Sequence, residues 1–150
     1  MPKVPAKIRG FWEIQLHDEA GHLKQHIQGE NVITTVGKEY LARYLNSAAT
    51  GATTNTIRYI AVGSNQTAEA AADTALGTEL ARVSGVVSYS SGAIFEVTGT
   101  FAAGVGTGSI YEYGLLSSAS VGTLFSRDTE ALITKGASDT LTVTTRVTFS

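Results

Sequence analysis

Strict alternation of apolar and polar residues is the pattern that most limits how this chain can fold. In the last run, residues 140–149, the apolar side chains Leu141, Val143 and Val147 alternate with polar ones. A period of two residues places successive side chains on opposite faces of a β-strand. The run FWEIQL, which begins at Phe11, alternates in the same way. The pattern therefore predicts half-buried strands at both ends of the chain.

Further β-rich runs lie between the two ends, and turn residues separate them. Asp and Gly at residues 18–21 predict a hairpin whose second strand is the run HLKQHIQ. Small residues at 90–92 predict a second hairpin. About eight strands with turn signals between them predict a mainly β fold, a two-sheet sandwich or jelly-roll-like body. The other predicted strands cover residues 57–63, 83–89, 93–101, 109–116, 123–127 and 140–149.

One segment has helical periodicity instead. Apolar residues between Val36 and Leu45 recur every three or four positions, and Thr34 or Thr35 can serve as the N-cap. This predicts one α-helix near residues 35–46. The alanine-rich run AEAAADTALG is interrupted by Asp, Thr and Gly, so it predicts short turns rather than a second helix.

The first ten residues differ from the rest in charge. Lys3, Lys7 and Arg9 occur there without an acidic residue, whereas the whole chain has 11 basic and 13 acidic side chains. Two prolines in the same segment favour an extended backbone. We therefore predict an extended basic N-terminal arm at residues 1–10 that contacts a partner, ahead of a single β-sandwich domain at residues 11–150. A frayed terminus is the alternative interpretation.

Two pairs of charged residues predict structural ion pairs, Glu112 with Arg127 and Glu79 with Arg82. Glu112 lies within the apolar run IYEYGLL, and Arg127 ends the run LFSR. Burying either charge alone is expensive, whereas a buried pair is tolerated. The alternative is an enzyme in which Glu112 is a general acid, but the spacing places no second carboxylate beside it.

The three histidines are the obvious candidates for a metal site. A turn at residues 18–21 places His17 opposite His22, with His26 two pairs further along the same face. Zinc requires at least three ligands that converge on one point, and His26 lies too far along the ladder. We therefore predict no metal site, and a pH-sensing histidine pair is the alternative.

Other common chemistries lack their sequence patterns. The chain has no cysteine, no G-x-S-x-G elbow and no phosphate-binding glycine pattern, so we predict no catalytic or cofactor-binding residues and no enzyme activity. No apolar run reaches signal-peptide or membrane-spanning length, which favours a soluble, unexported chain without a membrane partner. The acidic body disfavours nucleic-acid binding.

A sugar-binding face is a further possibility, because Trp and Tyr often line such faces. Alternation assigns most of the aromatic residues to the core or to strand pairs, which favours a structural role. The residues concerned are Trp12, Tyr59, Tyr89, Tyr111 and Tyr113.

The order of several short motifs resembles a group of small structural proteins of the tailed-bacteriophage virion. The motifs are NVITTVG, IRYIAVGS, ADTALGTELAR, YEYGLL, LFSRD and DTLTVTTRVTF, and they span residues 31–149. The resemblance implies a non-enzymatic virion protein, either a head decoration (cement) protein or a tail, baseplate or fibre-adaptor protein. It also implies contact with the major capsid protein or other virion proteins, a homo-oligomer such as a trimer or dimer, and assembly in the cytoplasm of the bacterial host.

Overall fold

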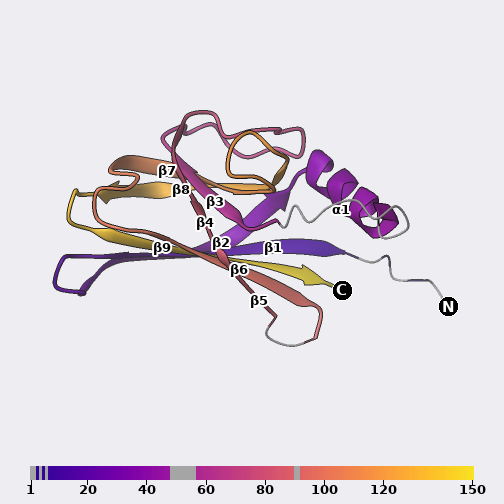
Figure 1. Ribbon diagram of the computed structural model, residues 1–150, viewed down its shortest axis with the longest axis horizontal. Coiled ribbons are helices and arrows are strands. Elements are labelled where there is room, and N and C mark those ends of the chain that lie inside the picture. The colour runs from indigo at the N-terminus through magenta and orange to yellow at the C-terminus, as the bar shows by residue number, and fades with distance from the viewer. Residues whose placement is uncertain (1–2, 4, 6, 48–56, 90–91) are drawn as a thin grey trace.

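The computed structural model describes residues 3, 5, 7–47, 57–89 and 92–150 (Figure 1). Within these residues, nine antiparallel strands and one helix form, which confirms the predicted mainly β fold class. The elements are β1 (Ile8–His17), β2 (Leu23–Ile33), α1 (Thr35–Ser47), β3 (Tyr59–Gly63), β4 (Glu79–Ser84), β5 (Val86–Tyr89), β6 (Ile94–Phe101), β7 (Gly108–Leu116), β8 (Leu124–Lys135) and β9 (Thr140–Phe149).

The strands form two packed layers that are joined through β2. The hydrogen-bonded order is β4-β3-β7-β8-β2-β1-β9-β6-β5. Most of β2 pairs with β1, but its last residues, Val32 and Ile33, pair with β8. One layer therefore contains β5, β6, β9, β1 and β2, and the other contains β8, β7, β3 and β4 (Figure 1). The two ends of the order, β4 and β5, are consecutive in the chain, so the sheet is nearly closed.

The core lies between the layers and uses the alternating residues that the sequence indicates. Trp12, Ile14 and Leu16 of β1 are buried, as are Leu141 and Val143 of the neighbouring β9. Burial of each large apolar side chain contributes about 1.5–3 kcal/mol to stability. The first hairpin also forms where predicted, with Gly21 in the left-handed region at φ +86°.

The helix α1 begins at the predicted cap. The Oγ1 of Thr34 accepts a hydrogen bond from the Gly37 N–H (3.0 Å) and donates one to the Leu124 carbonyl. Gly37 is needed because a Cβ there would overlap the backbone of Phe125. The cap therefore fastens α1 to β8. No helix in the described part of the chain is long and apolar enough to cross a membrane.

The predicted strand at residues 83–89 is wrong in one respect, because Gly85 divides it into the ends of two strands. Gly85 donates its N–H to the Arg58 carbonyl (2.7 Å). A side chain at this position would overlap Val97 of β6. The chain therefore passes from one layer to the other at Gly85, as the only residue between β4 and β5.

The strand predicted at residues 123–127 is longer than expected. It continues to Lys135 as β8, because its second half pairs with the start of β7, where Ile133 stands opposite Ile110. The alanine-rich run behaves as predicted: it forms turns and bends, not a helix.

The predicted boundary of the N-terminal arm is also wrong. Lys7 exchanges two backbone hydrogen bonds with Ser150 (2.6 and 2.9 Å), and β1 begins at Ile8. Ile8 packs against the core, and Arg9 pairs with Thr148 of β9. The alternation that we placed from residue 11 onward therefore starts earlier, and the body includes residues 7–10.

Candidate functional site

The buried Glu112 of β7 holds a long loop, residues 64–78, against the outer face of its layer. Its side chain is fully buried. The carboxylate accepts hydrogen bonds from three backbone N–H groups of the loop, those of Asn65 (3.3 Å), Gly77 (2.9 Å) and Thr78 (2.7 Å). Bonds to a charged acceptor are stronger than neutral ones. One carboxylate therefore fixes both ends of this loop.

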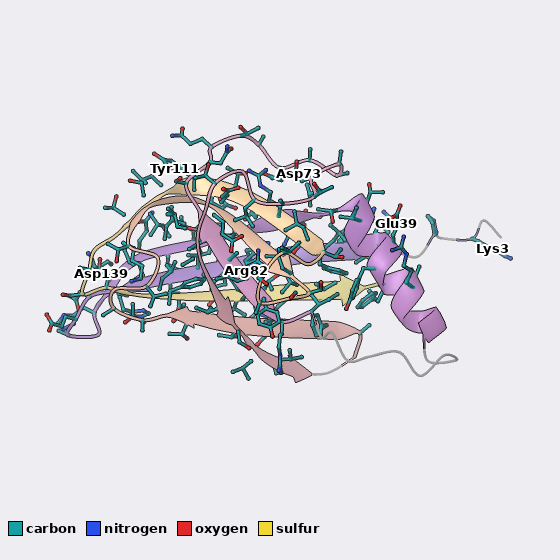
Figure 2. All side chains as sticks on the ribbon, turned by 45° about the horizontal axis from the view of Figure 1, so that its top comes forward. Lys3, Glu39, Asp73, Arg82, Tyr111 and Asp139 are labelled. Carbon is teal, nitrogen blue, oxygen red and sulfur yellow. The ribbon has the colours of Figure 1, made fainter. Side chains whose placement is uncertain are left out.

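Arg127 of β8 completes the network, which confirms the predicted pair with Glu112. Its Nε donates to Glu112 Oε2 (3.0 Å). One terminal nitrogen donates to Asp73 (3.0 Å) and the other to the Thr67 carbonyl (2.9 Å), so Arg127 binds the middle of the loop 64–78. Figure 2 shows Asp73 on this loop, above the sheet. Arg127 is 3% exposed, and its single positive charge lies against the carboxylates of both Glu112 and Asp73, which compensates for its burial.

A small apolar cluster also packs the loop 64–78 against the sheet. Leu76 packs on the outer face of the layer with Ala61, Leu116 and Leu124. Leu76 occupies the space above Gly114, where any side chain would overlap it. Glycine at this position of β7 therefore allows the loop to approach the sheet closely.

The second predicted pair, Glu79 with Arg82, is present and reaches a different loop. Arg82 donates two hydrogen bonds to the Glu79 carboxylate (2.8 and 2.7 Å). A third nitrogen donates to the carbonyls of Ser118 and Val121, both at 2.8 Å. Arg82 thus connects β4 to the loop between β7 and β8, a role that the sequence does not indicate because these residues are far apart in the chain.

A buried carboxyl group that the sequence analysis missed lies on the inner side of β8. Asp128 is 1% exposed, and neither of its oxygens has a hydrogen-bond partner in the described part of the chain. Burial, together with the neighbouring carboxyl groups of Glu130 and Glu69, raises the pKa of Asp128 to about 9. The acid form, which carries no buried charge, is therefore the one that fits this site.

Tyr113 stands opposite Asp128 and shares its environment. The two residues are paired across β7 and β8, and the Tyr113 hydroxyl is buried without a partner among the described residues. Burial, followed by the charges of Asp128 and Glu130, raises the pKa of Tyr113. Tyr113 also packs against Trp12, with ring centroids 6.1 Å apart. Both rings are fully buried, so they form no exposed sugar-binding platform.

The remaining aromatic candidates do not extend such a platform. Tyr59 is half-buried and packs against the cluster around Leu76, and Tyr111 is half-buried on β7. The side chain of Tyr89 lies outside the described residues.

The histidines of the first hairpin do not meet as predicted. His17 pairs with Leu23 instead of His22, because the register shifts between Leu16 and His17. His22 contacts Asp18 (3.3 Å), while His26 lies 3.9 Å from Glu13 on the other strand. Among the described residues, no group of three or more His, Cys, Asp or Glu side chains has a geometry that could hold a metal ion.

The three basic residues of the predicted arm occupy different surroundings. Both Lys7 and Arg9 are exposed, but Lys7 bonds to Ser150 just before β1 and Arg9 pairs with Thr148 within it, so neither lies on a free segment. Lys3 is exposed and lies outside the two layers, on the side of the molecule where α1 is found (Figure 2). Of the three, Lys3 alone stands clear of the body.

No protein-family model, no curated protein and no solved structure matches this chain. The Glu112 carboxylate accepts hydrogen bonds from four donors. Each nitrogen of the Arg127 guanidinium also donates a hydrogen bond within the chain. These groups are arranged to fasten a loop, and a general acid would instead need a proton within reach of a substrate.

Proposed function

We propose that this chain is a non-enzymatic structural protein of the tailed-bacteriophage virion, specifically a head decoration (cement) protein that stabilises the capsid. The observation that carries the non-enzymatic part is the use of the buried charges. Glu112 and Arg127 form hydrogen bonds with the loop 64–78, and Arg82 forms hydrogen bonds with the loop 117–123. The candidate groups thus make a rigid body rather than a reactive site.

The architecture supports a role in assembly. The nine-stranded order leaves one edge of β4 and one edge of β5 without a strand partner in the described part of the chain. Open edges bind extended segments through main-chain hydrogen bonds. A rigid body with open edges suits a protein that is held by its neighbours.

The assignment to a virion rests on the resemblance that the six ordered motifs carry. On this proposal the partners are the major capsid protein and other copies of the same chain, in a dimer or trimer with closed symmetry. The protein would be made in the cytoplasm of the bacterial host and would end in the virion. A tail, baseplate or fibre-adaptor protein is the alternative within the same group.

The proposal is tested by removing and restoring the chain. We expect heads of a phage that encodes this chain, produced without it, to release DNA at a lower temperature than wild-type heads. Adding purified chain should coat these heads and restore their heat resistance, while wild-type heads, already occupied, should take up none. Chain that remains unbound to heads would contradict the proposal, and binding to tails alone would favour the alternative.

A further inference from the structure

The 11 basic side chains of this protein differ in whether they have a carboxylate partner. Four of them form ion pairs, namely Lys24, Arg82, Arg127 and Arg146. A fifth, Lys135, is buried and donates to the Ala102 carbonyl. The other six form no ion pair within the described residues, which include every Asp and Glu of the chain. These six are Lys3, Lys7, Arg9, Lys38, Arg43 and Arg58.

The six unpaired cations lie together at one end of the two-layer body, where β2 leads into α1, and we name this surface the basic end. Lys38 and Arg43 are exposed on α1. Lys7 and Arg9 lie at the same end, because the start of β1 pairs with the last residues of β2. Figure 2 shows Lys3 on the side of the molecule where α1 is found.

Arg58 reaches the basic end from the other layer. The next residue, Tyr59, begins β3 and pairs with Leu116, which in turn pairs with Leu124. The Leu124 carbonyl accepts the hydrogen bond from Thr34, the cap of α1. Arg58 is half-buried, and its Nε has no hydrogen-bond partner among the described residues. Because burying a cation without a counter-charge is costly, a carboxylate brought by a partner would stabilise Arg58.

The position of the six cations divides the protein into two oppositely charged parts. At the basic end only Glu30 and Glu39 are acidic. The rest of the chain carries five of the basic side chains and eleven of the acidic ones. Like charges that gather on one surface repel each other, and an opposite charge on a partner removes this repulsion. The basic end is therefore suited to a negatively charged partner.

We infer that the basic end is the surface through which this chain docks on an acidic surface of another protein. The inference rests on the proposed function, in which that protein belongs to the virion. Nucleic acid fits the basic end less well, because Glu30 and Glu39 lie among the cations and the rest of the chain is acidic, which repels a stiff, uniformly negative duplex. A protein surface carries both signs of charge and can match such a mixture.

The test measures the affinity of the full chain for poly-L-glutamate, for a DNA duplex and for phage heads produced without the chain. We expect the wild type to bind poly-L-glutamate and heads, to bind the duplex more weakly, and to lose affinity as salt rises, because salt screens exposed charges. The double variant Lys38→Gln, Arg43→Gln should bind poly-L-glutamate and heads about three- to tenfold more weakly.

The matched control is the double variant Lys24→Gln, Arg146→Gln. It removes the same amount of charge from outside the basic end, where both residues are paired with carboxylates. We expect its affinity for poly-L-glutamate and for heads to equal that of the wild type. A loss as large as that of the α1 variant would show that net charge alone determines binding, and would overturn the inference.

Two further variants keep the inference falsifiable if the α1 variant does not fold. Lys3→Gln with Lys7→Gln changes only exposed side chains and should weaken binding to a similar degree. Arg58→Gln should weaken binding without lowering the melting temperature, because the free chain offers Arg58 no carboxylate to lose. A lower melting temperature with unchanged binding would contradict the role of Arg58 in the basic end.

The remaining outcomes separate the inference from the proposed function. A wild-type chain that binds neither poly-L-glutamate nor heads, or that binds the DNA duplex more tightly than poly-L-glutamate, would overturn the inference. Heads coated equally well by the wild type and the α1 variant would overturn the inference and leave the proposed function standing. Binding to poly-L-glutamate that depends on the basic end, without binding to any virion, would overturn the proposed function alone.

Discussion

Asp128 of β8 stands directly opposite Tyr113 of β7, and both side chains are buried without a hydrogen-bond partner in the described part of the chain. Leaving a buried polar group unpaired costs about 1–3 kcal/mol, and an unpaired charge costs more. The chain avoids the larger penalty by keeping the proton on Asp128, since burial and its acidic neighbours raise the pKa of Asp128 to about 9. This pair therefore links stability to pH.

The first prediction is the sign of that link. An unfolded Asp has a pKa of about 3.9, so between about pH 4 and pH 9 the unfolded chain releases this proton while the folded chain retains it. The contribution of Asp128 to the free energy of unfolding is complete below this window and falls by about 1.4 kcal/mol per pH unit across it. Asp128→Asn should remove this slope and should be more stable than the wild type near pH 8.

Urea unfolding at pH 5, 7 and 8 measures this effect. Glu19→Gln is the control, because Glu19 is exposed in the first hairpin turn and should leave the slope unchanged. Equal slopes for the wild type and Asp128→Asn would show that Asp128 ionises normally.

The second prediction concerns the Glu112 and Arg127 network. Glu112→Gln and Arg127→Met should each lower the free energy of unfolding by about 3–5 kcal/mol, since Arg127 then keeps only the partly exposed Asp73, or Glu112 loses its cationic partner. Both variants should also speed hydrogen exchange at Gly77 and Thr78, whose N–H groups bond to Glu112. Denaturant unfolding and amide exchange measure the two effects. Variants as stable as the wild type would mean that the network does not fasten the loop.

The third prediction follows from the corrected start of the body. Deleting residues 1–6 should leave the free energy of unfolding unchanged, whereas deleting residues 1–10 should lower it by about 2 kcal/mol or more. The longer deletion removes the Lys7 bonds to Ser150 and the packing of Ile8. Thermal melting distinguishes the two truncations. Equal melting temperatures would contradict the corrected boundary and support a free arm at residues 1–10.

The fourth prediction sets helix propensity against packing. Ala is favoured over Gly inside a helix by about 1 kcal/mol. Gly37→Ala should nevertheless destabilise the protein by about 1–3 kcal/mol, because its Cβ would overlap the Phe125 backbone and force α1 away from β8. Gly37→Ala melting above the wild type would show that α1 shifts at little cost.

The sequence predicts local structure in this protein better than its long-range contacts. Alternation in β1 and β9, the Thr34 cap and the charges inside apolar runs all depend on neighbouring residues, and each prediction is confirmed. By contrast, Gly85 separates two strands because Val97 and Arg58 lie around it, and neither is near it in sequence. No local pattern marks that contact.

The missed parts of the site have the same cause. Asp128 lies just beyond the strand predicted at residues 123–127, and its burial comes from the continuation of β8 opposite Tyr113 of β7. Arg82 binds Ser118 and Val121 across a loop, and only the fold brings them together. An aspartate directly after the strand predicted at residues 123–127 is the one signal that could have pointed to Asp128.

The central claim is that this chain is a structural component held by its neighbours in a virion. The most direct measurement is a cryo-electron microscopy reconstruction of purified particles of a phage that encodes the chain. The account predicts density on the outer surface of the head into which the two-layer body fits, repeated with the symmetry of the shell. Particles that lack the chain altogether, by reconstruction and by mass spectrometry, would contradict it.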